Sequence, residues 1–403
     1  MTNLQKKFTT ALATGAVLAN AFVPAAFAST DLTITGNGSN SDSDVNVTKT
    51  NNTVVTQNNT ANVNNNVKVD ANTGGNSASD NTGGDVKVRT GDANTDVTVK
   101  NMLNSNSADV ANCGGCGEDV DVEISGNGTH SDNKADLDFK NNVELFQTNN
   151  ADVKNKVDVD ANSGDNDIDD NTGGDVTVRT GDVNTDVKIM TVANANSARI
   201  GGNGDSNGGE ISAHILGNGS HSDNDIYLDF NSDILLTQAN NADIENDVDV
   251  DADSGHNDVE DNTGGDTALL TGDIDTSVIV DNMVNFNAAD VEDCCFGDLT
   301  AKIAGNGTDS DNKIDFDSEN ALVAFQNNDA DLDNDTDVDG DTGDNDVDDN
   351  TGAYDAESDP YLQTGNSDSE VSVHNDGGMN VYGDVELGFD LSDLMDWFHS
   401  FAN

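Results

Sequence analysis

The stretch GNGSNSD at residues 36–42 is the first of four near copies, which recur as GNGTHSD from Gly126, GNGSHSD from Gly217 and GNGTDSD from Gly305. Successive copies begin 90, 91 and 88 residues apart. The same intervals separate Gln57, Gln147, Gln238 and Gln326, and also four copies of DNTG whose Asn residues are 81, 171, 262 and 350. Three landmarks that share one spacing indicate an internal repeat of about 90 residues.

The repeat and the N-terminus set the expected organisation of the chain. Lys6 and Lys7 precede an apolar stretch that ends in Ala26-Phe27-Ala28, the pattern of a signal peptide with its cleavage site. We expect a signal peptide at residues 1–28, full repeats at 29–120, 121–211 and 212–300, a partial fourth repeat at 301–353 and a C-terminal segment at 354–403. This organisation predicts a secreted protein, extracellular or on the cell surface, with no membrane span after signal cleavage.

Within each repeat the hydrophobic pattern has a period of two. Strings such as DVKVRT, DVTVRT and KVDVDA alternate β-branched with polar residues, as a strand with one buried face does. Thr-Gly or Ser-Gly pairs lie between such strings, and in repeat two they begin at Ser163, Thr172 and Thr180, 9 and 8 residues apart. This spacing predicts short strands joined by tight turns, because glycine adopts the positive φ that tight turns need.

An all-β, repeat-built fold follows, and two architectures fit it. One is a row of tandem β-sandwich domains, one per repeat; the other is a continuous β-solenoid in which each repeat supplies several coils. The turn spacing and the aromatic content of only 4% favour the β-solenoid, because sandwiches usually need bulkier cores. A short C-terminal helix is expected in LSDLMDWFHSFA, where Leu391, Leu394, Met395, Phe398 and Phe401 recur at helical spacing.

The composition excludes several classes of partner. The chain has 77 Asp and Glu against 16 Lys and Arg, a formal net charge of -61. Because such a charge repels phosphate groups, we expect no nucleic acid and no anionic lipid surface as a partner. High net charge with low hydropathy is also typical of disordered chains, so a disordered acidic calcium-binding protein stays open as an alternative.

Acidic residues are concentrated in DLDNDTDVDGDTGDNDVDDNTG, from Asp331 to Gly352. Calcium takes about six to eight oxygen ligands, and clustered carboxylates supply them while the ion relieves their repulsion. We therefore predict calcium as the cofactor. The candidate ligands are Asp335, Asp337, Asp339, Asp341 and Asp346 of the fourth repeat, and Asp247, Asp249, Asp251, Asp253 and Asp258 at the corresponding positions of the third.

Two geometries for these ligands stay open. In the fourth repeat they match the spacing of the EF-hand calcium loop, with Gly340 at the turn position, whereas the third repeat has Ala252 there. In the alternative, the aspartates alternate with residues such as Val248 and Val250, so that the carboxylates line one face of a strand. Adjacent strands or neighbouring molecules then share ions between such rows. The second geometry accounts for more of the copies.

Four cysteines are disulfide candidates, and they occupy the same loop of repeats one and three. They are Cys113 and Cys116 in CGGC, and Cys294 and Cys295 in DCCFGD. Export favours disulfides, and the simplest pairing is local, within each pair. Bridges between molecules stay open as an alternative.

No residue pattern predicts catalysis. His130 and His221 share one repeat position with Asn40 and Asp309, which indicates a polar turn position rather than a catalytic histidine. No pair of carboxylates is distinguished from the many similar ones, as an acid–base pair has to be. We therefore predict that the protein is not an enzyme.

The chain resembles the repetitive Asn-, Asp-, Gly- and Thr-rich secreted surface proteins of microbes, which include surface-layer, fibre-forming and adhesin proteins. Together with the acidic repeats, the resemblance implies a non-catalytic structural protein that forms a homopolymer, a cell-surface layer or filament, with calcium on its acidic faces. A head-to-tail contact would use the uneven charge, since repeat one carries Lys and Asn where repeats three and four carry Asp. The alternative is an adhesin or a solenoid that binds ice or carbohydrate, for which a cell-wall or surface glycan is the candidate partner.

Overall fold

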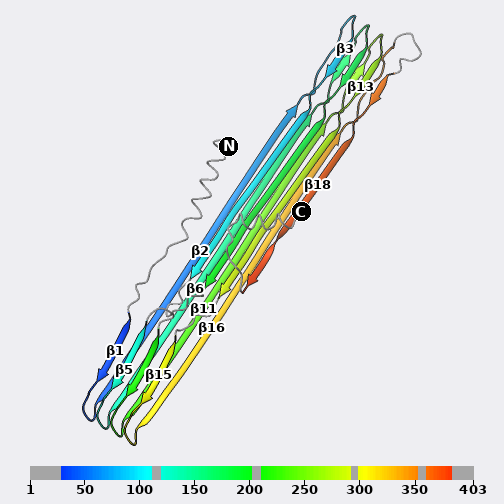
Figure 1. The fold of residues 1–403 in the computed structure, drawn as a ribbon. Coiled ribbons are helices and arrows are strands. Elements are labelled where there is room, and N and C mark those ends of the chain that lie inside the picture. The colour runs from blue at the N-terminus through cyan, green and yellow to red at the C-terminus, as the bar shows by residue number, and fades with distance from the viewer. Residues whose placement is uncertain (1–28, 111–118, 202–209, 292–297, 353–359, 384–403) are drawn as a thin grey trace.

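The computed structural model describes residues 29–110, 119–201, 210–291, 298–352 and 360–383, which form an elongated all-β body (Figure 1). These residues form strands and turns, and no helix occurs among them. Within the same ranges, nothing helical has the length and apolar character of a membrane span. The helix expected between Leu391 and Phe401 lies outside the described residues.

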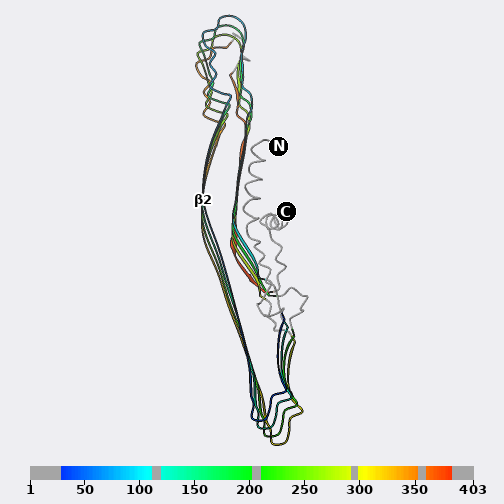
Figure 2. The ribbon, with the colours of Figure 1, turned by 90° about the vertical axis from the view of Figure 1, so that its left-hand side faces the viewer.

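Each repeat forms one flattened coil, which runs along one layer of the molecule and returns along the other (Figure 2). In the first coil, β1 (Thr30–Thr35) leads into the long β2 (Asp42–Asn72), and the chain returns through β3 (Val86–Arg89) and β4 (Ala93–Val110). The 31 residues of β2 span about 100 Å, at ~3.3 Å per residue. The long strand forms one layer, and the shorter strands form the other.

The remaining coils repeat this order. The second coil contains β5 (Val120–Ser125), β6 (Asp132–Asn162), β7 (Asp167–Asp169), β8 (Val176–Arg179) and β9 (Val183–Ile200). The third contains β10 (Ile211–Leu216), β11 (Asp223–Asp253), β12 (Asp258–Glu260), β13 (Thr267–Leu270) and β14 (Ile274–Val291). The fourth contains β15 (Leu299–Ala304), β16 (Asp311–Asp341), β17 (Tyr361–Gln363) and β18 (Ser367–Tyr382). Although the sequence likeness between repeats ends near Gly352, β17 and β18 pair with β13 and β14. The fourth coil therefore continues to Tyr382, past residue 353.

The coils stack in parallel, so that residues of one repeat lie beside their counterparts in the next. The long strands form the sheet β16-β11-β6-β2, and the return strands form the sheets β18-β14-β9-β4, β17-β13-β8-β3 and β1-β5-β10-β15. Gln147 pairs with Gln57 on one side and Gln238 on the other, as their common spacing requires. The predicted all-β solenoid is confirmed. The prediction that each repeat supplies several coils is wrong, because one repeat builds one coil.

The Ser-Gly and Thr-Gly pairs do not divide the repeat evenly. All three pairs of repeat two lie between the end of β6 and the start of β9, at one tip of the coil. The short strands that these pairs bound, β7 and β8, therefore lie at that tip, whereas uninterrupted strands of 31 and 18 residues form most of the coil and the six-residue β5 lies toward its other end. Glycine is required in the tip because the coils approach closely there: a Cβ on Gly164 would lie 1.9 Å from the carbonyl oxygen of Gly255.

Apolar side chains from the two layers meet between them. Along β11 alternate residues are buried, and Val248 and Val250 point inward as the period-two pattern predicts. They pack against Val187 and Val278 of the opposite layer and against their counterparts in neighbouring coils. The core is thus one side chain deep from each layer and consists mainly of β-branched residues.

Columns of amide side chains cross the coils within this core. Asn149 is fully buried, and its Nδ2 lies 3.1 Å from Oδ1 of Asn240 while its Oδ1 accepts from Nδ2 of Asn59 at 3.0 Å. A second column in the return layer bonds to the first, with Asn149 Nδ2 at 2.9 Å from Asn196 Oδ1. Buried amides are costly unless their donors and acceptors are paired. These Asn ladders therefore hold the coils in a single register.

Candidate cation-binding site

The predicted calcium ligands lie beside one another on the third and fourth coils. The pairs are Asp247 with Asp335, Asp249 with Asp337, Asp251 with Asp339, Asp253 with Asp341, and Asp258 with Asp346. We call these ten residues the acidic rows. The first four pairs belong to β11 and β16, and those on β11 alternate with buried valines, as the strand-face geometry predicts.

The acidic rows do not form an EF-hand loop. Residues Asp335 to Asp341 are the extended end of β16, whereas an EF-hand loop wraps its residues around one ion. Successive carboxylates instead lie ~7 Å apart along a strand and ~4.8 Å apart between coils. A cation on this surface would therefore bridge carboxylates of adjacent coils.

Lysines compensate the carboxylates only between the first three coils. Lys68 Nζ lies 2.9 Å from Asp158 Oδ2, and Lys156 Nζ lies 2.5 Å from Asp247 Oδ2. Between the third and fourth coils, no Lys or Arg in the described ranges forms ion pairs with both aspartates of any of the five pairs. Two carboxylates ~4.8 Å apart repel by about 1 kcal/mol in water and by more where they are partly buried. Apart from Asp247 beside Lys156 and the aspartates beside His256, the carboxylates of the rows form no ion pair with a described cationic side chain, and their repulsion would destabilise the cation-free fold.

Burial and neighbouring charges raise the proton affinity of carboxyls in the rows. Burial is the main cause that raises the pKa of Asp251, followed by the charges of neighbours that include Asp160 and Asp339. Burial is likewise the first cause, and the charge of Asp346 the second, of the raised pKa of Asp258. Both effects disfavour the ionised form, and a bound cation would reverse them.

A further row of carboxylates closes the turn between β1 and β2 and its counterparts. Asp42, Asp132, Asp223 and Asp311 end the four GNG strings, and they stack as the first residues of the long strands. Burial, followed by the charges of Asp223 and Asp42, raises the pKa of Asp132. No metal-site spacing in the sequence indicates this row, because its members lie in four different repeats. The one signal in the sequence is that each of the four strings ends in Asp, which indicates a row of carboxylates once the repeats are known to stack in register.

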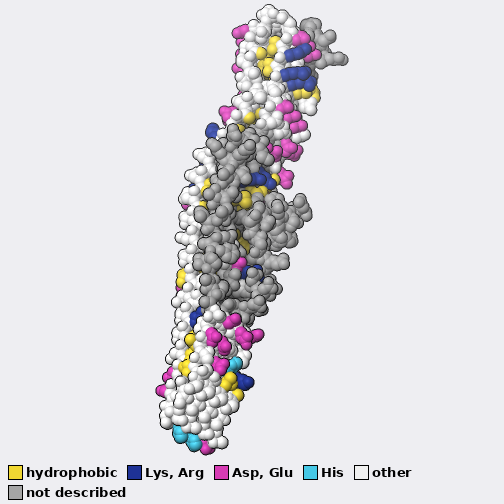
Figure 3. Space-filling model, turned by 60° about the vertical axis from the view of Figure 1, so that its left-hand side comes forward, with side chains coloured by type: hydrophobic (Ala, Val, Ile, Leu, Met, Phe, Trp, Pro, Cys, Tyr) yellow, Lys and Arg dark blue, Asp and Glu magenta, His cyan; other side chains and the backbone are white. Residues whose placement is uncertain are grey.

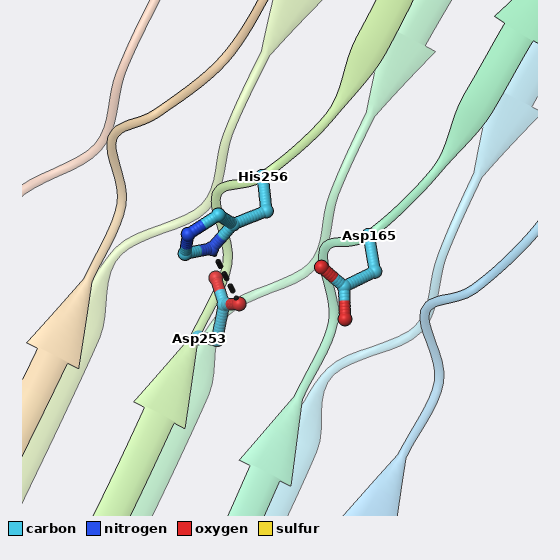
Figure 4. A group of neighbouring side chains, drawn as sticks. All are labelled: Asp165, Asp253 and His256. Atoms are coloured by element: carbon cyan, nitrogen blue, oxygen red, sulfur yellow. Dashed lines mark hydrogen bonds and ion pairs between the residues drawn. The ribbon is translucent and has the colours of Figure 1, made fainter.

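Two groups of side chains that could hold a metal ion lie where the long strands end. Asp165, Asp253 and His256 have ligand atoms within 4.8 Å of one another, and so do His256, Asp341 and Asp344. We call these five residues the turn cluster. Figure 4 shows the first group, in which Asp253 and His256 come from one turn and Asp165 from the turn of the preceding coil. The cluster thus spans three coils.

The backbone of the turn places these side chains in one column. Asp165, His256 and Asp344 occupy the same turn position with φ values of 56°, 53° and 49°, and Gly75 takes it in the first coil with 66°. Asn, Asp and His tolerate this left-handed region better than most residues. In-register stacking therefore produces a column in which a histidine lies between two aspartates.

His256 lies between carboxylates of two coils. Its Nδ1 is 2.9 Å from Oδ2 of Asp253, and its Nε2 is 3.7 Å from Oδ2 of Asp344 and 3.9 Å from Oδ2 of Asp341. The hydrogen bond with Asp253 is the main cause that raises the pKa of His256. Burial raises the pKa of Asp253, outweighing the hydrogen bonds from His256 and the Gly255 N–H.

The turn cluster has two chemical uses. A protonated His256 serves as an internal counter-ion for the surrounding carboxylates. A neutral His256 together with those carboxylates forms a mixed nitrogen and oxygen donor set, which suits a divalent transition metal better than calcium. Because both uses need the same ring nitrogens, protons and a metal ion would compete at this position.

The sequence predicted Asp253 and Asp341 of this cluster but not Asp165, His256 or Asp344. These three share the fourth position of the string [N/D]-[S/T]-G-x-N, which occurs at 72–76, 162–166, 253–257 and 341–345. The residue type at that position changes from copy to copy, so no ligand spacing along the chain marks it. The stacking of the turns brings them together.

Two further histidines, His130 and His221, lie in the GNG turns and stack on each other there. Figure 3 shows histidine side chains at one tip of the molecule, and carboxylates in groups along the visible face. His130 and His221 stack with ring centroids 5.0 Å apart, at turn positions whose φ values are 56° and 59°. The polar turn expected at this repeat position is confirmed.

The disulfide candidates Cys113, Cys116, Cys294 and Cys295 lie outside the described residues. Among known proteins, the chain matches no protein-family model, no curated protein and no solved structure. What characterises it is a repetitive parallel-β structure with Asn ladders and exposed groups of Asp and His that could hold a metal ion.

Proposed function

We propose that the protein is a non-catalytic extracellular structural protein, which assembles with itself into a surface layer or filament and binds calcium on its acidic rows. The observation that carries the proposal is the pairing of five aspartates of the third coil with five of the fourth. Calcium would relieve the repulsion within these pairs by sharing their oxygens, since it accepts many carboxylate ligands in flexible geometry. Cation binding would then stabilise the contact between coils.

The interior of the solenoid supports a scaffold role. A cavity of about 130 Å³ lies near Met283, Phe286 and Met379, which is smaller than the ~300 Å³ of the smallest usual ligand pockets. Elsewhere in the described part of the chain, valine clusters and Asn ladders fill the space between the layers. An elongated body with such a core suits a load-bearing element better than a catalyst.

Calcium titration of the full chain tests the proposal. We expect circular dichroism to show a higher melting temperature with calcium, and light scattering to show larger particles, both reversed by chelator. Magnesium should act more weakly at equal concentration, because it dehydrates reluctantly and needs near-octahedral geometry. A β-rich monomer that ignores calcium would contradict the proposal and leave the glycan-binding solenoid as the alternative to pursue.

Matched variants assign the effect to the acidic rows. Asp251→Asn and Asp233→Asn each remove one charge from the outer face of β11, but Asp251 faces Asp160 and Asp339 whereas Asp233 faces Asn142 and Ala321. Asp251→Asn should stabilise the cation-free protein by about 1 kcal/mol and weaken its response to calcium. Asp233→Asn should change neither. Equal calcium responses in the two variants would exclude the rows as the binding surface.

A further inference from the structure

The exposed apolar side chains of the molecule are concentrated on its last coil. Every large hydrophobic residue that is exposed in the described ranges belongs to the fourth coil, except Val54. Ile314, Leu362 and Val371 are 48%, 46% and 48% exposed. Their counterparts in the third coil, Ile226, Leu269 and Val278, are fully buried. The fourth coil therefore presents core positions to its open side.

The two edge strands of the stack are also without a further strand partner among the described residues. In the long-strand sheet, β16 and β2 are the two edges, and each is 31 residues long. A long edge strand with apolar side chains is a template for further strand pairing. Most native sheets shorten, charge or cover such an edge. β16 carries many acidic residues, but its stretch from Ala321 to Asn328 has no charge and includes the exposed Leu322, Val323 and Phe325.

We infer that this edge receives the first coil of a second copy, so that copies join head to tail with the repeat register continued across the junction. The inference rests on the proposed function, whose self-assembly it specifies, and commits to β2 and β4 of one copy against β16 and β18 of another. The apolar positions match, because Val45 and Val97 occupy in the first coil the columns that Ile314 and Val371 occupy in the fourth.

The amide ladders have complementary ends. In the Gln ladder each Nε2 donates to the preceding coil, as Gln147 does to Gln57 at 2.7 Å and Gln326 to Gln238 at 2.8 Å. In the ladder formed by Asn59, Asn149, Asn240 and Asn328, each Nδ2 donates to the following coil, as Asn240 does to Asn328 at 3.0 Å. A second copy in register continues both: its Gln57 would donate to Gln326 Oε1, and Asn328 would donate to its Asn59.

The charges at the junction are complementary in part. Continued register places Lys68 of the second copy beside Asp337, and Asp44 beside Lys313. The first of these contacts repeats the step between coils one and two, where Lys68 pairs with Asp158 at 2.9 Å. Asp70 would face Asp339, a like-charged contact of the kind that the proposed calcium would relieve between the third and fourth coils. A reversed, tail-to-tail contact would make the strands antiparallel and interrupt both ladders.

Such a junction uses different surfaces on the two partners, so the joined pair still has one free edge of each kind. Contacts of this type build open filaments rather than closed dimers. The inferred assembly is therefore a filament whose coils stack along its axis.

Engineered cysteines test the junction in the full chain, with the four native cysteines replaced by serine. Val54 and Val323 occupy the same outward-facing column of the first and fourth coils. Within one chain they lie three coil spacings apart, ~14 Å, which is beyond the ~7 Å limit between the Cα atoms of a disulfide. A bond between V54C and V323C must therefore join two copies.

Mild oxidation of the V54C/V323C variant in calcium should give a ladder of dimers, trimers and larger species, with the 54–323 linkage identified by mass spectrometry. The register control V54C/F325C shifts one partner by two residues, and it should crosslink at least tenfold less. Homodimers of V54C alone or V323C alone would overturn the head-to-tail arrangement. Particles that grow in light scattering without the 54–323 linkage would overturn the junction while leaving the proposed assembly intact, whereas a chain that never assembles would overturn both.

Discussion

Replacing the buried Asn149 with alanine is expected to lower the free energy of unfolding by about 3–5 kcal/mol. Its Nδ2 lies 2.9 Å from Asn196 Oδ1 and 3.1 Å from Asn240 Oδ1, and its Oδ1 accepts from Asn59 and Asn106 at 3.0 Å each. Alanine removes these four contacts at a fully buried position. Each hydrogen bond contributes about 1 kcal/mol net, and a donor left without a partner costs more.

Two matched variants separate the ladder from general effects of substitution. Thr148→Ala changes the exposed neighbour of Asn149 on the same strand and should alter stability by no more than about 0.5 kcal/mol. Asn328→Ala removes the ladder residue of the fourth coil, where water can replace lost bonds, and should cost less than Asn149→Ala. The expected order of destabilisation is Asn149, then Asn328, then Thr148.

Urea unfolding followed by circular dichroism measures these differences, at low protein concentration with chelator so that assembly does not contribute. The midpoint should fall for Asn149→Ala while the slope of the transition stays unchanged, because the surface exposed on unfolding is the same. An Asn149→Ala variant as stable as Thr148→Ala would refute the view that the Asn ladders set the register. Equal losses at Asn149 and Asn328 would instead show that burial of the amide does not determine its contribution.

Three further outcomes are expected from the turns and the acidic rows. Because the pKa values of Asp251 and Asp258 in the rows are raised, these carboxyls bind more protons in the folded state than in the unfolded state. The cation-free protein should therefore melt at a higher temperature near pH 5 than near pH 7.5, and calcium should reduce this difference. A melting temperature that does not change with pH in the absence of calcium would contradict this expectation. The raised pKa of His256 acts in the same direction at higher pH: its contribution is complete below the unfolded value of 6.5 and is lost as pH rises through the folded value, so His256→Asn should destabilise at pH 6 but not at pH 9. His130→Asn, in a turn without this cluster, should show no such dependence in thermal melts. Gly164→Ala should lower the free energy of unfolding in urea by about 1–3 kcal/mol or more, because its Cβ would meet the carbonyl oxygen of Gly255 at 1.9 Å. Gly91→Ala, whose Cβ would have its nearest atom at 3.9 Å, should be tolerated. Similar losses of stability at both sites would show that the coils separate more easily than the structure indicates.

The sequence carried enough information for the parallel repeat but not for the size of the coil. Equal spacing of Gln57, Gln147 and Gln238 already implied that equivalent residues could stack, and they do. The Thr-Gly spacing suggested short strands because local turn signals do not show how far the chain runs between turns. That distance is set by contacts between repeats, such as the Asn ladders, which form only once whole coils are adjacent.

The candidate site divides in the same way. Alternation of Asp and Val along residues 247–253 placed the carboxylates on one strand face, and this part of the prediction is confirmed. The neighbours of each carboxylate could not be predicted from the sequence, because the residues that complete the turn cluster lie about ninety positions apart along the chain. Asp165 and His256 share a turn position, not a motif, and stacking alone makes them neighbours.

The distance between the first and fourth coils tests whether each repeat forms one coil that is stacked in register on the next. Nitroxide labels at Asn58 and Asn327 occupy one outward-facing column, three coil spacings or ~14 Å apart. Pulsed dipolar spectroscopy of the doubly labelled chain, with its native cysteines replaced and diluted in unlabelled protein, should give a narrow distribution centred between about 15 and 25 Å once label length is included. Separate domains, each ~25–30 Å across, would place the labels beyond about 60 Å, and such a result would contradict the stacked solenoid.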